Sequence, residues 1–152
     1  MHLESVRPAL SAIEAECLRC IAGHMIPASE AFGVPGADDA IIVADMTGSI
    51  GRDEPALAEL LRSVDAAAGG RLVSLDPTER ETLLARLRTA DYTAFAVLEA
   101  VVSRAYYRDD RVLASIGMDA RPPFPQGYEL PATDWSLLDP VRERGPVWRQ
   151  AD

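Results

Sequence analysis

The sequence predicts an all-α fold. We expect a small bundle of about five helices in residues 1–116, followed by a proline-rich, mostly irregular C-terminal arm in residues 117–152. Apolar residues recur at spacings of three and four in stretches bounded by capping residues, glycine or proline. No period-two alternation longer than four residues indicates a strand. The arm holds six of the 11 prolines and both tryptophans, so repeated helix is not expected there.

Capping signals mark where the first three helices begin. Ser11 and Glu14 have the form of a capping box, in which each side chain satisfies the backbone amide of the other residue. The acids Asp38 and Asp39 favour a second helix start, and Asp53 is the expected N-cap of the third helix. The expected helices run from Ser11 to about Met25, from Asp38 to near Gly48–Gly51, and from Asp53 to Gly69-Gly70.

Two further helices complete the expected bundle. Asp76 and Glu79 form a second capping box, with Pro77 at the first helical position, where proline is tolerated. The expected spans are Asp76 through Leu87, about Asp91 to Tyr107, and a short helical turn around residues 110–115 that leads into the arm. Short connections favour antiparallel packing of neighbouring helices.

Composition excludes several classes of function. The formal net charge is −9, whereas nucleic-acid binding needs a basic footprint. No apolar run approaches the roughly 18 residues of a membrane span, so no direct membrane insertion is expected. Residues 1–8 lack a basic region followed by an apolar stretch, and the two cysteines do not make a disulfide scaffold. We therefore expect a cytoplasmic protein with reduced cysteines.

Cys17, Cys20 and His24 are candidates for a metal-binding or redox role. All three share one face of the first helix, and three such ligands on one face suit Zn²⁺. No second CxxC or HxxxH completes the site, and a free cysteine is among the most buried residue types, so packing is the favoured interpretation. A thioredoxin-like role needs the CxxC between a strand and a helix start. A small metal or redox protein stays as the alternative function.

No catalytic constellation is visible in the sequence. The GxGxxG, GxSxG, Walker A and HExxH patterns are absent. The adjacent acids Asp38 and Asp39 do not face each other on a helix, so they are better explained as partners of the helix dipole. We therefore expect that the chain is not an enzyme by itself, with no catalytic residue, no cofactor and no metal of its own.

The arm is too aromatic for a linker and needs a broad surface to lie against. That surface belongs to the chain's own helices, to a partner subunit, or to both. Tryptophan and arginine are enriched among the residues that dominate binding at interfaces. Its arginines could bind an anion, or they could pair with Asp139, Glu143 or acids of the partner. The candidate interface residues are Tyr106, Tyr107, Phe124, Tyr128, Trp135, Arg142, Arg144, Trp148 and Arg149.

Several short stretches occur in an order that resembles a known family. They are Ile26-Pro27-Ala28, Pro35-Gly36-Ala37, the run Leu75-Asp76-Pro77-Thr78-Glu79-Arg80, Ala105-Tyr106-Tyr107 with Ile116-Gly117, and residues 138–149. Together they span most of the chain. This order resembles the gluconate 2-dehydrogenase subunit 3 family, whose members are small helical subunits that accompany flavin-dependent GMC-type dehydrogenases of sugars and alcohols.

The resemblance implies a non-catalytic partner of a large FAD-containing GMC-type subunit. In that family the small subunit is thought to help the flavoprotein fold and persist, as part of a hetero-oligomer that oxidises a sugar, glycoside or alcohol. The resemblance gives this chain no catalytic residues, flavin ligands or metal site, so FAD is expected in the partner. Family members are often periplasmic, but no twin-arginine motif is seen here, which favours a cytoplasmic complex.

Overall fold

The computed structural model describes residues 10–121, 124, 127 and 132–146. The chain divides into two compact units, a helical unit Met1–Ala120 and a C-terminal unit Arg121–Asp152, and each is considered by itself. The expected boundary between residues 116 and 117 lies close to this division. The all-α prediction is confirmed, because the described residues form helices, turns and one isolated bridge between Ser29 and Val34.

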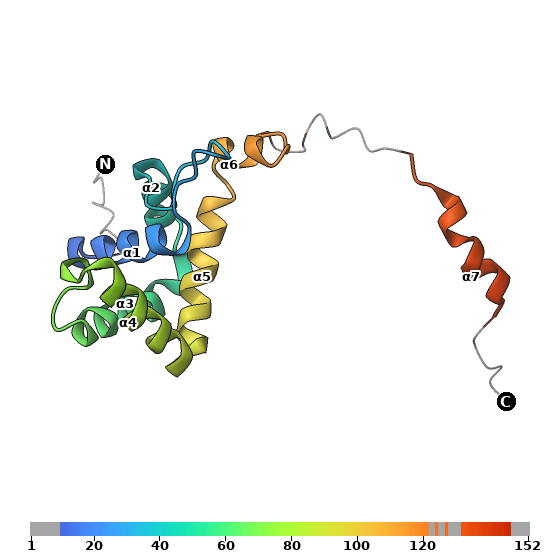
Figure 1. The fold of residues 1–152 in the computed structure, drawn as a ribbon. Helices are drawn as coiled ribbons and strands as arrows, with labels where there is room; N and C mark the ends of the chain where they lie inside the picture. Colours follow the sequence, from blue (N-terminus) through green and yellow to red (C-terminus); the bar gives the residue numbers. More distant parts are fainter. Residues whose placement is uncertain (1–9, 122–123, 125–126, 128–131, 147–152) are drawn as a thin grey trace, which may run out of the picture. The chain divides into compact units, whose positions relative to one another are not determined.

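The described part of the helical unit contains six α-helices and two short 3₁₀ turns (Figure 1). The α-helices are α1 (Ala12–Met25), α2 (Ala40–Gly48), α3 (Glu54–Ala67), α4 (Pro77–Ala90), α5 (Tyr92–Tyr106) and α6 (Asp110–Ser115). The 3₁₀ turns are η1 (Gly51–Asp53) before α3 and η2 (Leu72–Ser74) before α4. The five expected helices and the short turn around residues 110–115 are therefore all present.

The capping residues act largely as the sequence predicts. Ser11 and Glu14 form a capping box, and the backbone N–H of Ser11 donates to Glu14 Oε2 at 2.8 Å. Asp76 caps α4 in the same way with Glu79. Asp53 differs, because η1 already holds it in helical geometry and its carboxylate pairs with an arginine of α5 instead of the backbone of α3.

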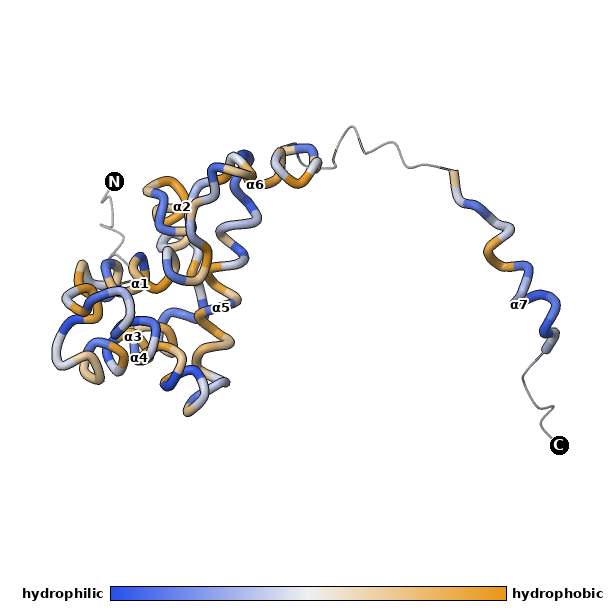
Figure 2. Tube along the Cα trace, viewed as in Figure 1, coloured by the Kyte–Doolittle hydropathy of each residue, from blue (hydrophilic) through white to orange (hydrophobic). Residues whose placement is uncertain are grey.

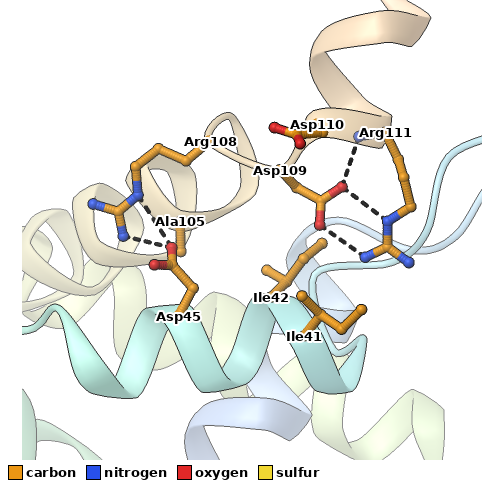
Figure 3. Close-up of a pocket in the computed structure, with 8 residues that line it drawn as sticks. All are labelled: Ile41, Ile42, Asp45, Ala105, Arg108, Asp109, Asp110 and Arg111. Carbon is orange, nitrogen blue, oxygen red and sulfur yellow. Dashed lines mark hydrogen bonds and ion pairs between the residues drawn. The ribbon is translucent and has the colours of Figure 1, made fainter. Parts of the chain in front are cut away.

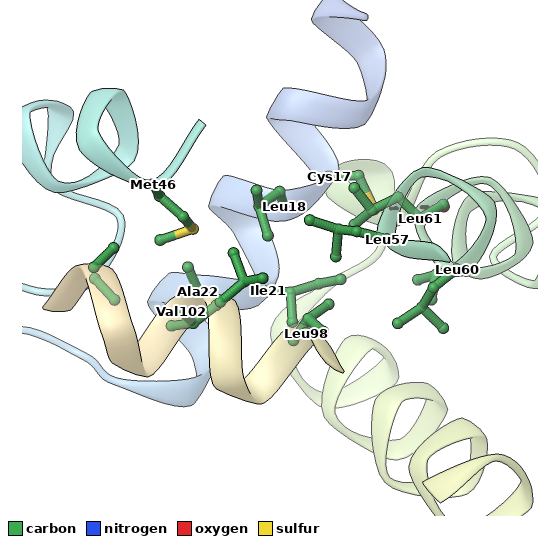
Figure 4. Close-up of a cluster of buried hydrophobic side chains, with 14 of the residues drawn as sticks. Cys17, Leu18, Ile21, Ala22, Met46, Leu57, Leu60, Leu61, Leu98 and Val102 are labelled. Atoms are coloured by element: carbon green, nitrogen blue, oxygen red, sulfur yellow. Dashed lines mark hydrogen bonds between the residues drawn. The ribbon is translucent and has the colours of Figure 1, made fainter. Parts of the chain in front are cut away.

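The core forms where α5 packs against α2, α3 and α4, while α1 packs against α3 and η2 (Figure 1). Figure 4 shows leucine, isoleucine and valine side chains of these helices pointing toward one another. Cys17 lies in this cluster and is 1% exposed. The fully buried large side chains include Leu18, Ile21, Ile42, Met46, Leu57, Leu61, Leu98 and Val102.

Gly36 is required by close packing before α2, and we predict that Gly36→Ala destabilises the chain by about 1–3 kcal/mol. A Cβ at this position would lie 2.9 Å from the backbone nitrogen of Ala28 and 2.4 Å from Asp38 Oδ1, and the backbone cannot easily move. The matched control is Gly23→Ala, whose Cβ would have three atoms of the Asp38 side chain as its nearest neighbours, with no backbone atom among them. Urea unfolding measures both variants, and equal destabilisation would contradict this interpretation.

The C-terminal unit is less irregular than expected. Its described residues form a 3₁₀ turn, η3 (Trp135–Leu138), which continues into α7 (Asp139–Arg144). Proline density does not prevent this helix, since Pro140 lies in its first turn, where a missing N–H costs nothing. Asp134 Oδ1 caps the segment by accepting from the Ser136 N–H at 3.0 Å, and Gly145 ends it with a φ of 68°.

Within the described residues, no helix combines the length and the apolar composition needed to cross a membrane.

Candidate interaction surface

The described part of the C-terminal unit exposes a group of large apolar side chains. We call Trp135, Leu137, Leu138 and Val141 the apolar segment; their exposed fractions lie between 41% and 74%. Trp135, Leu138 and Val141 recur every three residues, so they fall near one side of the continuous η3–α7 helical stretch. Figure 2 shows this hydrophobic stretch followed by a hydrophilic one in α7. Phe124, nearer the helical unit in sequence, is 83% exposed.

The arginines of α7 lie beside the apolar segment. Arg142 Nη1 donates to Asp139 Oδ1 at 3.0 Å, which is one of the pairings expected from the sequence. Arg144 is exposed and has no carboxylate within ion-pair distance among the described residues. Both guanidinium groups are accessible, and exposed pairs of this kind are weak. Their positions fit the polar rim that surrounds an apolar interface core.

Tyr106 lies in the core, whereas Tyr107 lies on the surface. Tyr106 is 5% exposed, and its hydroxyl donates to the carbonyl oxygen of Pro35 at 3.2 Å. Burial raises the pKa of Tyr106. Tyr107 is 54% exposed and meets the Tyr106 ring edge-on, with 5.3 Å between ring centroids. Tyr106 therefore has little free surface to offer a partner, whereas Tyr107 remains accessible.

Three candidate interface residues, Tyr128, Trp148 and Arg149, lie outside the described residues. The arm's described contribution therefore comes from Phe124 and from residues 132–146.

Cys17, Cys20 and His24 lie along α1 as the spacing predicts, but in different environments. Cys17 is buried, and its Sγ–H donates to the Leu61 carbonyl at 3.8 Å. Burial, then the charge of Asp65, raises the pKa of the Cys17 thiol, and burial also raises that of Cys20. A raised pKa disfavours the thiolate, which is the form that binds metals and attacks disulfides. No group of three or more metal-ligating side chains assembles within the described residues.

The helical unit also contains a pocket that sequence patterns did not reveal. It has a volume of about 580 Å³ and lies between α2, the end of α5 and the start of α6 (Figure 3). Ile41 and Ile42 of α2 lie between two ion pairs, one made by Arg108 with Asp45 at 2.6 Å and one made by Arg111 with Asp109 at 2.8 Å. The sequence offers no signal for this site, because α2 and the α5–α6 junction that line it lie about 60 residues apart in the chain and Arg108 pairs with Asp45 across 63 positions.

Arg111 holds two carboxylates at once. Its Nη2 donates to Asp39 Oδ1 and to Asp109 Oδ2, at 2.8 Å each. Asp39 is also the N-cap of α2, and Asp109 caps α6, so one guanidinium ties together the starts of two helices. Hydrogen bonds from Arg111 hold the pKa of both carboxyl groups below their usual range.

Acid is therefore expected to weaken the helical unit through these two groups. Because their pKa values are depressed on folding, the stabilisation is present above the unfolded pKa near 3.8 and is lost as pH falls through the folded values. We predict that Arg111→Met loses less stability than wild type between about pH 5 and pH 3.

Thermal midpoints measured across this pH range test that prediction. Arg142→Met is the matched control, because it removes an exposed ion pair within α7 and should keep the wild-type pH profile. Parallel pH profiles for wild type and Arg111→Met would contradict the conclusion that Arg111 lowers the pKa values of Asp39 and Asp109.

Comparison with protein-family models, curated proteins and solved structures finds no match to this chain. The candidate surface therefore rests on the chain's own geometry. It combines the exposed apolar segment with the accessible arginines of α7, and Tyr107 is the exposed aromatic side chain at the end of α5.

Proposed function

We propose that this chain is a non-catalytic accessory subunit that binds a large FAD-dependent GMC-type oxidoreductase subunit and helps it to fold and persist. The observation that carries the proposal is the exposed apolar segment of η3–α7. The resemblance to gluconate 2-dehydrogenase subunit 3 supplies the class of partner. In the resulting hetero-oligomer the partner holds FAD and oxidises a sugar, glycoside or alcohol.

The physical argument concerns what the apolar segment gains from a partner. Burial of each large apolar side chain contributes about 1.5–3 kcal/mol, and the segment holds four of them. An isolated helix as short as α7 is marginal in water, so binding in a groove would also order it. This mode of binding, in which an amphipathic helix presents anchors at spacings of three or four, is common in subunit recognition.

Trp135 is the expected anchor, and we predict that Trp135→Ala weakens binding to the flavoprotein by about 10- to 100-fold. Its indole is the largest side chain of the apolar segment and is 64% exposed in the chain. Tyr92→Ala is the matched control, because Tyr92 is a similarly exposed aromatic residue of the helical unit. Calorimetric titration of the flavoprotein with each variant measures the effect. An unchanged affinity for Trp135→Ala would remove Trp135 from the interface.

Co-expression tests the proposed function itself. A GMC-type flavoprotein from the same organism is produced with and without the chain, and the soluble yield and flavin content of the flavoprotein are compared. The proposal expects more soluble, FAD-loaded flavoprotein when the chain is present. A flavoprotein that reaches full yield and activity alone would contradict it.

A further inference from the structure

A second cavity, of about 480 Å³, lies on the helical unit between α1, the loop before α2 and the start of α4. Charged and polar side chains from three segments line it. Arg19, Cys20 and His24 come from α1, Asp38 from the loop, and Arg80 from α4. The same cavity therefore contains two arginines that are more than 60 positions apart in sequence.

Arg80 lines this cavity and has a buried donor without an acceptor among the described residues. Its Nη2 donates to the carbonyl oxygens of Leu75 at 3.0 Å and Val73 at 3.4 Å, which fixes the guanidinium in place. The Nε–H is fully buried and has no hydrogen-bond partner. Buried donors without acceptors are rare in folded proteins, so each one needs an explanation. This N–H is shielded from the cavity, so Nη1, which has no hydrogen-bond partner among the described residues, is the donor that a ligand in the cavity would meet.

Arg19 is similarly free to bind a ligand. Its Nε donates to the backbone carbonyl oxygen of Asp38 at 3.0 Å, and neither Arg19 nor Arg80 has a carboxylate at ion-pair distance among the described residues. This differs from most arginines in the described part of the helical unit. Those paired with a carboxylate are Arg62, Arg71, Arg88, Arg104, Arg108 and Arg111.

The local charge at the cavity is positive, although the chain as a whole carries −9. Glu16 lies on the wall but is already paired with Arg71. Asp38 is then the one acid on the wall without an ion pair among the described residues, and Arg19 and Arg80 line the same wall. Two positive groups against one negative group leave a formal excess of one positive charge. The excess favours an anionic ligand.

We propose that this cavity binds a small oxyanion, either phosphate or the carboxylate of a small molecule, between Arg19 and Arg80. Guanidinium groups present planar pairs of N–H donors that match the oxygens of both anions. The Nη groups of Arg19 and the Nη1 group of Arg80, which have no partner among the described residues, are the expected donors. The proposal does not depend on the flavoprotein partner.

Binding is tested on the full-length chain with two probes. Inorganic phosphate and acetate are titrated separately by calorimetry, with sodium chloride holding the ionic strength constant. We expect saturable one-site binding of at least one probe, with a Kd of about 1 mM or lower. Phosphate binding alone identifies a tetrahedral oxyanion site, and acetate binding identifies a carboxylate site. No saturable binding of either probe would overturn the proposal.

Cys20 provides an independent readout because it lines the cavity, whereas Cys17 is buried. The bound probe should slow alkylation of Cys20 by iodoacetamide, and the Cys20→Ser variant should lose that signal. Saturable calorimetric binding with unchanged alkylation of Cys20 would place the anion elsewhere and overturn the assignment.

Substitution of the arginines locates the site. Arg19→Gln and Arg80→Gln should each weaken binding by at least about 10-fold. Arg86→Gln is the matched control, since Arg86 is an exposed arginine of α4 that does not line the cavity. Arg19→Gln is decisive, because the Arg19 side chain makes a single hydrogen bond within the described residues and its loss should not unfold α1. Retained binding in folded Arg19→Gln, or an equal loss in Arg86→Gln, would overturn the proposal.

Discussion

Removal of residues 121–152 is expected to weaken the complex with the flavoprotein by at least about 100-fold while the helical unit stays folded. The deletion removes the whole apolar segment and the arginines of α7. The buried hydrophobic residues, by contrast, all lie between Leu10 and Val112 among the described positions. Loss of the C-terminal unit therefore leaves that core complete.

Two measurements on the truncated chain separate binding from folding. Circular dichroism and the thermal midpoint report on the helical unit, and calorimetric titration with the flavoprotein reports on binding. We expect a helical spectrum with a cooperative transition, together with lost binding. An unfolded truncated chain would show instead that the helical unit needs the arm, which is the alternative that the sequence left open.

The largest effect on stability is expected for Leu98→Ala, which should reduce the free energy of unfolding by about 2–5 kcal/mol. Leu98 lies on α5 and is fully buried, and Figure 4 shows it close to Ile21 of α1 and Leu57 of α3. Truncation to alanine removes the contacts of the side chain and leaves a cavity that the surrounding helices cannot close completely. Folded domains are stable by only about 5–15 kcal/mol, so the loss is a large fraction of the total.

Urea unfolding monitored by circular dichroism measures this loss. Ile13→Ala is the control, because Ile13 of α1 is 53% exposed and its truncation should change stability by less than about 0.5 kcal/mol. Similar losses of stability in the two variants would contradict the conclusion that α5 supplies the core contacts that stabilise the fold.

Local sequence signals predicted the helical unit well. The capping boxes at Ser11 and Asp76 begin helices because a side chain and the backbone satisfy each other within four residues. Such interactions depend on neighbours in the sequence, so they can be read without knowing the fold. Asp53 shows the limit of this reasoning, since its carboxylate pairs with Arg104, 51 residues away.

The helix α7 was missed because proline density was given too much weight. Pro140 falls in the first turn, the one place in a helix where proline has no cost, and Asp134 caps the preceding turn. The pattern Asp134, Pro140 and Gly145 is in fact a start and stop signal of the kind that identified the earlier helices.

The charged sites could not be predicted because they join distant residues. Arg111 and Asp39 are 72 positions apart, and Arg108 and Asp45 are 63 positions apart. Arginines and acids are numerous in this chain, so no spacing rule selects these pairs from the others. The cavity lined by Arg19 and Arg80 could not be predicted either, because these two residues are far apart in the sequence. Cys20 and His24, which the sequence singled out as candidate ligands, also line this cavity.

Size-exclusion chromatography of the full-length chain, co-expressed with a GMC-type flavoprotein from the same organism, tests the central claim most directly. The visible absorbance of the flavin marks the catalytic subunit as it elutes. We predict that the chain co-elutes with the flavin-containing subunit and that the yield of this subunit falls sharply when the chain is omitted. Separate elution of the two proteins, with a fully loaded and active flavoprotein in the absence of the chain, would contradict it.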